Sequence, residues 1–467
     1  MAEKQHKDTE KKWFWRIIDG IEGDKVVWII VLLLSMFSIL AIFSSTSLLD
    51  EGDKTRIDFI MDHVKIAGVG LLLVYGIYKI PWLGLFRALS KAGFAVSMIC
   101  LILLVSKIDI DGVIVSEYIN GARRTLRIFG QQFHVYEVVK VAMVMYIAWA
   151  LNAYKEDQEA LGKGKKSEYL GFANMFVHSK NFKFLAEPWA KRCIYMYLPI
   201  MIVLFFVMMG SNSSAMFIGL LLLVVLLIGN LPKKDIVLAG IGILIIGSIG
   251  AGIYFMSGKT KMKRVGTAIT RLKANYTDLE EIKKLPKNSV EYYDAIDEKR
   301  QPYGALIAVR EGGLLGKRSG NSTQKYVVPN IYGDYMFSFV IEEYGRAGGI
   351  ILLIIYVSLL ARGSLIAKNC SNEFAKIAVG GLCILITGQA FMHMLVCVDL
   401  MPMTGQTLPM ISHGSFAYLV FCIAFGVILS ISRMAQKKLR AEEEAAKPLY
   451  ESDKDDIQVT MDVLEQL

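Results

Sequence analysis

The sequence predicts an all-α polytopic membrane protein with about ten transmembrane helices and one large extracytoplasmic loop. Hydrophobic residues make up 54% of the 467 residues, whereas only 20% are charged. The apolar residues are gathered in long blocks, and about ten of these blocks approach the roughly 20 residues that a helix needs to cross a bilayer. A chain of several soluble domains would be less apolar than this.

The predicted spans follow one another along most of the chain. Their approximate ranges are 26–47, 64–80, 88–106, 134–151, 193–210, 213–231, 235–256, 335–361, 376–398 and 411–432. A charged leader, 1–25, precedes the transmembrane domain at 26–432, and a tail, 433–467, follows it. Because no small-residue cleavage site follows the first apolar block, we expect this block to be a retained span and not a signal peptide.

Lysine and arginine are distributed unequally between the two sets of loops that ten spans create. With the N-terminus inside, 28 of them fall in cytoplasmic segments and 6 in the opposite short loops. This asymmetry predicts a multi-pass protein of the cytoplasmic (inner) membrane with both termini in the cytoplasm. The net charge of +9 therefore reflects topology, and nucleic-acid binding is not expected.

The stretch 257–333, between the seventh and eighth spans, is predicted as the large extracytoplasmic loop. It is rich in lysine and arginine, among them Arg264 and Lys317, and would attract an anionic group. Within it, "EGGLLGKRSGNS" (311–322) contains Gly312 and Gly313, which allow backbone to approach a ligand closely. The alternative is a solvated loop whose charges keep it out of lipid.

Several ionisable residues lie in or beside the predicted spans, where burying a charge costs about 2.5 to 3.5 kcal/mol on insertion scales. Glu137 and Lys140 lie one helical turn apart, so they can partly neutralise each other. Asp334 precedes the eighth apolar run, and Glu342 and Glu343 fall within it. Each is a candidate functional residue, with a structural ion pair or an interfacial position as the alternative.

Six cysteines and six histidines are scattered along the chain without a CxxC pair. This arrangement indicates neither a disulfide framework nor a zinc site, so no metal-binding residues are predicted. The absence of a Walker loop gives no support to an ATP-driven transporter.

Five motifs, in order, resemble those of the SEDS family (shape, elongation, division and sporulation), which includes FtsW, RodA and SpoVE. They are "FSSTS" (43–47), "GARRTLRIFGQQFHVYEVVKVAMVMYIA" (121–148), "QPYGALIAVREGGLLGKRSGNS" (301–322), "VPNIYGDYMFSFVIEEYGRAGG" (328–349) and "MPMTGQTLPMISHGSFAYL" (401–419). The resemblance extends over nearly the whole chain. Within the family, the leader, the tail and the first span are most like the FtsW branch, which favours cell division.

The resemblance implies a peptidoglycan glycosyltransferase that polymerises lipid II on the outer face of the membrane. It also implies a class B penicillin-binding protein as partner, together with other divisome proteins. Asp334 matches the family's essential aspartate, and a placed carboxylate suits a general base that deprotonates the acceptor's 4-hydroxyl group. A divalent cation, Mg²⁺ or Mn²⁺, is compatible with a pyrophosphate leaving group, although no ligand cluster indicates one.

The resemblance assigns two further groups of residues. Those expected in the lipid II cavity are Arg124, Glu137, Lys140, Arg264, Gly312, Gly313, Lys317 and Ser412. Those expected to hold the structure or couple to the partner are Glu342, Glu343, Gly345, Thr404, Gly405, Pro409 and Gly414. The cationic members would stabilise the charge that develops on the leaving pyrophosphate.

The sequence also departs from the family pattern. Thr125 replaces a tryptophan, Glu311 a small residue and Ser415 a glycine, and the segment around Asn212 lacks the family's acid. None of these changes touches Asp334. Three alternatives stay open: an elongation-type polymerase of the RodA branch, a lipid II flippase that would use the same cavity, and a non-catalytic scaffold that recruits the transpeptidase.

Overall fold

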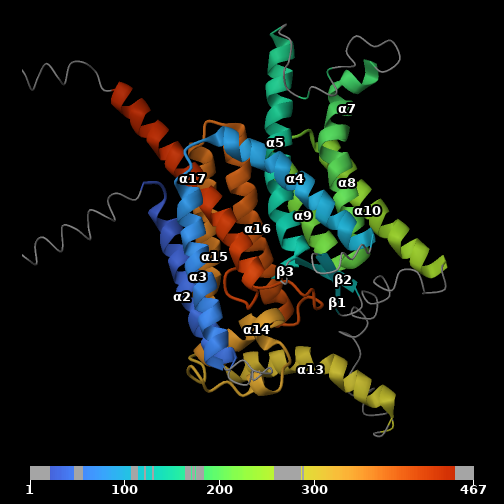
Figure 1. Ribbon diagram of the computed structural model, residues 1–467, viewed down its shortest axis with the longest axis vertical. Helices are drawn as coiled ribbons and strands as arrows, with labels where there is room; N and C mark the ends of the chain where they lie inside the picture. Colours follow the sequence, from blue (N-terminus) through green and yellow to red (C-terminus); the bar gives the residue numbers. More distant parts are fainter. Residues whose placement is uncertain are drawn as a thin grey trace, which may run out of the picture.

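The computed structural model describes residues 22–46, 56–106, 114–119, 122–128, 131–163, 170, 174, 183–256, 286 and 289–446. Long helices dominate these residues and lie side by side as a bundle (Figure 1). Of the predicted leader and tail, 1–21 and 447–467 lie outside the described residues, as do 257–285 and 287–288 of the predicted outer loop. The predicted domain boundaries therefore stay predictions.

Each predicted span coincides with a helix. These helices are α2 (Lys25–Ser45), α3 (Arg56–Tyr78), α4 (Leu83–Ser106), α5 (Val135–Gly162), α8 (Leu198–Gly210), α9 (Asn212–Ile228), α10 (Lys233–Met256), α15 (Met336–Asn369), α16 (Glu373–Cys397) and α17 (Ser415–Ala446). In the described part of the chain, seven helical segments are long and apolar enough to cross a membrane, and α9 is a shorter apolar helix. The predicted polytopic all-α class is confirmed.

Local sequence explains where several of these helices begin. The Asp24 carboxylate accepts hydrogen bonds from the backbone N–H groups of Val26 and Val27 and so caps α2. The Ser211 hydroxyl and the Asn372 side chain cap α9 and α16 in the same way. Helix α17 continues well past its apolar part, because the charged residues that follow are good helix formers.

The structure contains a small sheet that the sequence analysis did not predict. Strands β1 (Ile114–Ile119), β2 (Ala122–Ile128) and β3 (Gln131–His134) form an antiparallel sheet in that order. Thr125 on β2 pairs with His134 on β3, and α5 begins at the next residue, Val135. Because these strands are too short to give an apolar block, the sequence indicates only a loop between the third and fourth spans.

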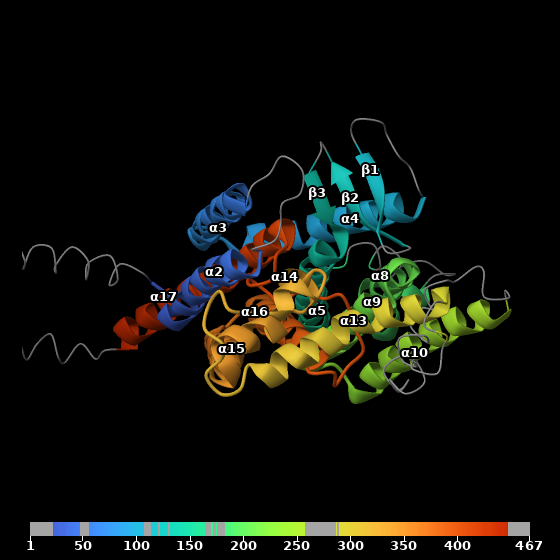
Figure 2. The ribbon, with the colours of Figure 1, turned by 90° about the horizontal axis from the view of Figure 1, so that it is seen from below.

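The elements before α15 gather at one end of the bundle. They are α13 (Val290–Glu311), η3 (Gln324–Tyr326) and α14 (Ile331–Asp334). Helix α13 crosses this end, and the sheet stands to one side of it (Figure 2). The start of α2 and the far part of α17 meet at the opposite end, where the backbone N–H of Asp24 donates to the Ser432 hydroxyl at 2.8 Å.

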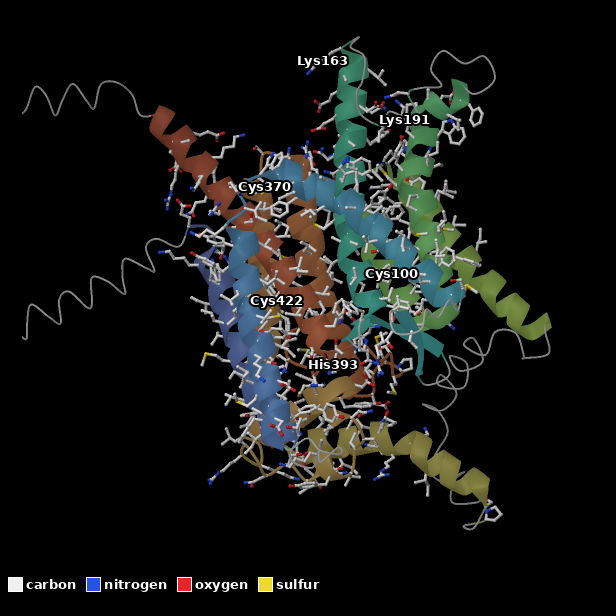
Figure 3. The ribbon with its side chains drawn as sticks, viewed as in Figure 1. Cys100, Lys163, Lys191, Cys370, His393 and Cys422 are labelled. Carbon is white, nitrogen blue, oxygen red and sulfur yellow. The ribbon has the colours of Figure 1, made fainter. Side chains whose placement is uncertain are left out.

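The six cysteines are free. Cys100, Cys370 and Cys422 lie in separate parts of the bundle (Figure 3).

Helix α15 is interrupted at Gly345, where φ is +73° and ψ is 179°. The glycine-containing segment 313–318 packs against this break and supplies the backbone partners that the helix lacks. The N–H groups of Arg346 and Ala347 donate to the carbonyls of Gly313 and Leu314 at 3.0 and 3.1 Å. In return, the N–H of Lys317 donates to the Glu342 carbonyl at 2.8 Å. Segment 313–318 and the break at Gly345 thus form one hydrogen-bonded joint.

We predict that Gly345→Ala lowers the free energy of unfolding by about 3 kcal/mol or more. Gly345 has a backbone conformation that almost only glycine adopts, and an added Cβ would lie 2.2 Å from the Leu314 carbonyl oxygen. Thermal unfolding in detergent micelles measures the change. Gly313→Ala is the matched control, because Gly313 also has a positive φ but open space around it, so a loss of only about 1 kcal/mol is expected. Equal losses would contradict a steric joint at Gly345.

Candidate functional site

A cavity of about 400 Å³ lies where β2, β3, the start of α5, α14 and the stretch between α16 and α17 meet. Asp334 and Glu137 both line it. Thr404, Gly405 and Gly414 line it from the stretch 398–414, which is not helical. The structure therefore brings together predicted residues that are far apart in the sequence.

Asp334 ends the short helix α14, and the stretch 398–414 holds this helix through backbone contacts. The Ser412 hydroxyl donates to the Gly333 carbonyl at 2.8 Å and accepts from the Leu408 N–H at 2.9 Å. The N–H of His413 donates to the Tyr332 carbonyl at 2.8 Å. Ser412 was predicted in the lipid II cavity. Its observed contact holds the backbone of Gly333, the residue directly before Asp334.

Lys140 lies behind Glu137 and is almost completely buried, with 1% of its side chain exposed. Its ammonium group donates to Glu137 Oε1 at 2.7 Å, Gln389 Oε1 at 2.6 Å and Gln406 Oε1 at 2.8 Å. These acceptors occupy the three N–H donors that a lysine carries. Lys140 therefore orients Glu137 from behind, and its donors are committed to protein groups.

Sequence analysis missed the polar residues that complete this network. Gln406 Nε2 donates to the Ser214 hydroxyl at 2.9 Å, and Gln389 Nε2 donates to the Thr407 carbonyl at 3.0 Å. His393 bonds the Gln406 carbonyl through Nδ1 at 2.8 Å and accepts from the Phe337 N–H through Nε2 at 3.3 Å. A signal was present, because Gln389 and His393 are polar residues four apart in an apolar span and so share one helical face.

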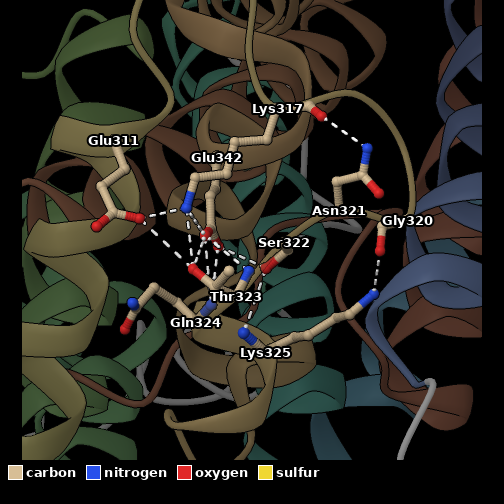
Figure 4. Close-up of polar contacts among 9 residues, drawn as sticks. All are labelled: Glu311, Lys317, Gly320, Asn321, Ser322, Thr323, Gln324, Lys325 and Glu342. Atoms are coloured by element: carbon tan, nitrogen blue, oxygen red, sulfur yellow. Dashed lines mark hydrogen bonds and ion pairs between the residues drawn. The ribbon is translucent and has the colours of Figure 1, made fainter.

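Glu342 and Glu343 do not line the cavity, and both are fully buried. Figure 4 shows the contacts between Glu342 and the segment 317–324. The Glu342 carboxylate accepts from Lys317 Nζ, the Thr323 N–H and the Thr323 hydroxyl, each at 2.9 Å. The Glu343 carboxylate accepts from the Ser44 hydroxyl at 2.6 Å and the Gly320 N–H at 3.0 Å. These contacts tie the segment to α15 and to the end of α2.

Gly312 and Lys317 belong to this same joint and do not line the cavity that contains Asp334. A Cβ on Gly312 would lie 2.1 Å from the Ile341 carbonyl oxygen, so the close approach made there is to α15. Burial acts to lower the pKa of Lys317, but hydrogen bonds and ion pairs with Glu311 and Glu342 outweigh it and raise that pKa. The ligand-binding roles expected of Gly312, Gly313 and Lys317 stay predictions.

The remaining predicted residues are placed as follows. The Pro409 carbonyl accepts from the buried Tyr356 hydroxyl at 2.5 Å, which anchors the stretch 398–414 to α15. Arg124 lies on β2 directly before Thr125, which lines the cavity. Arg264 lies outside the described residues.

Across the part of the chain that the structure describes, no group of three or more His, Cys, Asp or Glu could hold a metal ion.

Comparison with known proteins identifies the family. The family model described as "Cell cycle protein", for FtsW, RodA and SpoVE, matches residues 24–437. The chain belongs to this FtsW/RodA/SpoVE family. The family expected from the five motifs is thus confirmed, and the match covers every helix of the bundle except the end of α17.

Individual relatives of this family member are distant but match over nearly their full length. A probable peptidoglycan glycosyltransferase FtsW from Geobacter sulfurreducens is 24% identical, covering 88% of this chain and 95% of the relative. Peptidoglycan glycosyltransferase MrdB from Escherichia coli is also 24% identical, covering 91% and 96%. A solved chain from a study of a peptidoglycan synthase complex shares the fold, with a TM-score of 0.55 and 18% identity over 88% of this chain and 98% of that chain.

We predict that Lys140→Met in this FtsW/RodA/SpoVE protein lowers the free energy of unfolding by about 3–5 kcal/mol, because it leaves the Glu137 charge uncompensated in a buried site. The double variant Glu137→Gln/Lys140→Met should recover most of this loss. Chemical unfolding in detergent micelles measures both variants.

The control for this prediction is Lys65→Met on α3, which breaks a pair of the same i,i+3 spacing with Asp62. The Lys65 and Asp62 side chains are 68% and 46% exposed, so a change within about 0.5 kcal/mol is expected. Similar losses for Lys65→Met and Lys140→Met would show that burial of the Glu137–Lys140 pair has no special energetic weight.

Proposed function

We infer that this chain is a peptidoglycan glycosyltransferase that polymerises lipid II on the outer face of the cytoplasmic membrane. The observation that carries the proposal is the placement of Asp334 in a cavity at the end of the bundle that carries the predicted outer loop. Family membership and the names of the relatives in Geobacter and Escherichia support the same activity.

In the proposed reaction, Asp334 is the general base. The 4-hydroxyl oxygen of the acceptor GlcNAc attacks C1 of the donor MurNAc, and its proton passes to the Asp334 carboxylate. The bond between C1 and the diphosphate oxygen breaks, and its electron pair leaves with undecaprenyl diphosphate. Because this leaving group needs no protonation, one carboxylate suffices, in contrast to the pair used in glycoside hydrolysis.

Glu137 is assigned a positioning role in the same cavity. Its carboxylate is paired with Lys140 at 2.7 Å and is held on the first turn of α5. An ion-paired carboxylate fixed in this way is suited to orienting a sugar hydroxyl group, whereas the base must release its proton again after each transfer.

We propose a class B penicillin-binding protein as the partner, with other divisome proteins around it. The solved relative belongs to work on polymerisation and crosslinking by a peptidoglycan synthase complex, which supports a partnership of this kind. The described start of α2 and the far part of α17 lie at the end of the bundle away from α13, as expected if both termini are cytoplasmic. The FtsW-like features of the leader, tail and first span favour a role in division, and the relatives include both FtsW and MrdB.

We predict that Asp334→Asn abolishes polymerisation of fluorescent lipid II by the purified protein with its cognate class B partner, reducing the rate by at least about 100-fold. The substitution keeps the side chain's size and removes its ability to accept a proton. Glycan length on gels and the rate of lipid II consumption are measured, with and without Mg²⁺ or Mn²⁺.

Asp399→Asn is the matched control. Asp399 is exposed, follows α16 and does not line the cavity, so this variant should polymerise like the parent. An Asp334→Asn variant as active as the parent would remove Asp334 from catalysis. An inactive parent that still moves lipid II across vesicles would favour the flippase, and one that only activates the transpeptidase would favour the scaffold.

A further inference from the structure

The described lining of the cavity that contains Asp334 offers a diphosphate no cationic Lys or Arg side chain. Two carboxylates, Asp334 and Glu137, line it, and none of its described lining residues is lysine or arginine. Lys140 is bonded to Glu137 and Gln406 of the cavity lining, and its three donors are taken by protein oxygens. A leaving diphosphate carries several negative charges and needs cations already in place. Among the described residues, such cations lie beside this cavity.

A second cavity, of about 250 Å³, borders the first. Asn330 and Tyr332 line both, so the segment that leads into α14 forms a shared wall. Arg300 and Lys325 line the second cavity, and none of its described lining residues is acidic. Ser45, the last residue of α2, also lines it. The cavity therefore lies at the end of a span, the level at which the headgroup of a lipid-linked substrate leaves the bilayer.

Lys325 is held in this cavity as a fixed charge, with 9% of the residue exposed. Its ammonium group donates to the Gly320 carbonyl at 2.8 Å and to the Ser44 carbonyl at 3.3 Å. These two carbonyls take two of the three donors that an ammonium group carries. Glu343 is the carboxylate that interacts with Lys325, and it is itself bonded by the Ser44 hydroxyl and the Gly320 N–H.

Arg300 faces the same cavity from α13. Its Nε–H donates to the Val327 carbonyl at 2.9 Å, which sets the plane of the guanidinium group. The terminal N–H groups of a guanidinium form a planar fork that matches two phosphate oxygens. Arg300 is exposed, so a ligand can reach it. The cavity thus holds a fixed ammonium group, from Lys325, and an oriented guanidinium group, from Arg300. Together they supply the N–H donors and positive charge that a diphosphate requires.

We propose that the cavity containing Arg300 and Lys325 binds the diphosphate of the donor glycolipid and retains undecaprenyl diphosphate as it leaves. This inference rests on the proposed polymerase function and adds to it a place for the leaving group. The acceptor oxygen forms its bond to C1 in the acidic cavity, where Asp334 takes the proton. The bond from C1 to the diphosphate oxygen breaks at the boundary between the two cavities, beside Asn330 and Tyr332, and the electron pair ends on the diphosphate in the basic cavity.

The test compares variants of the full chain in lipid nanodiscs by their affinity for undecaprenyl diphosphate, measured by displacement of a fluorescent polyprenyl diphosphate. Arg300→Ala should weaken binding about tenfold, as expected for a lost hydrogen bond to a charged group. Arg300→Lys should weaken it less, because the charge stays and the fork is lost. Arg310→Ala, on the same helix and also exposed, lines neither cavity and should bind like the parent.

Two competitors distinguish the anionic parts of the glycolipid. Inorganic diphosphate should displace the probe from the parent and lose potency in Arg300→Ala, whereas a soluble stem peptide, which offers carboxylates, should not compete. Competition by the stem peptide alone would overturn the assignment to the diphosphate. Equal weakening in Arg300→Ala and Arg310→Ala would indicate a diffuse basic surface and would also overturn it, as would unchanged binding in Arg300→Ala.

Polymerisation assays separate this inference from the proposed function. A parent that polymerises lipid II, together with Arg300→Ala binding that matches the parent, overturns the diphosphate site and leaves the proposed function intact. A parent that never polymerises overturns the proposed function, and the binding assay still decides whether the cavity takes a diphosphate. When both hold, Arg300→Ala should also weaken product inhibition by undecaprenyl diphosphate by a similar factor.

Discussion

The buried ammonium group of Lys140 is the constraint on which the functional end of the molecule depends. A charge inside the bundle is tolerated only with close partners, and Lys140 takes one from each of three segments: Glu137 on α5, Gln389 on α16 and Gln406 in the stretch 398–414. These segments must converge for the charge to be satisfied. The stretch that Gln406 belongs to then holds α14 through Ser412, and α14 ends at Asp334.

Four acidic residues near this end, Glu137, Asp334, Glu342 and Glu343, show how environment separates residues of one type. Glu342 and Glu343 accept hydrogen bonds from the segment 317–324 and act as anchors for a joint in α15. Glu137 and Asp334 line a cavity, one of them paired with a buried lysine. The anchors are enclosed by donors of the protein itself, whereas the other two carboxylates line a cavity.

Charge is divided between two adjoining cavities on either side of one short segment. Acidic residues line the cavity where a hydroxyl group would lose its proton, and basic residues line the one where a diphosphate would gain charge. Nucleophile activation and leaving-group stabilisation require opposite local potentials, so a single small cavity would serve one of them poorly. The segment between them carries Asn330 in a left-handed conformation, with φ at +53°, directly before α14. A turn of this kind lets one short piece of chain face both cavities.

The sequence by itself determined the membrane class, the order of the spans and the pairing of Glu137 with Lys140. Apolar blocks and i,i+3 spacing are local properties, so they can be read without knowing which segments meet. Glycines beside cations suggested a ligand site at Gly312 and Lys317, which stays a prediction, but local sequence could not reveal that these residues pack against α15. The sheet around Thr125, the network of Gln389, Gln406 and His393, and the cavity of Arg300 and Lys325 each depend on contacts between distant segments. Only the tertiary structure decided them, because burial and partner choice are set by packing across the whole chain.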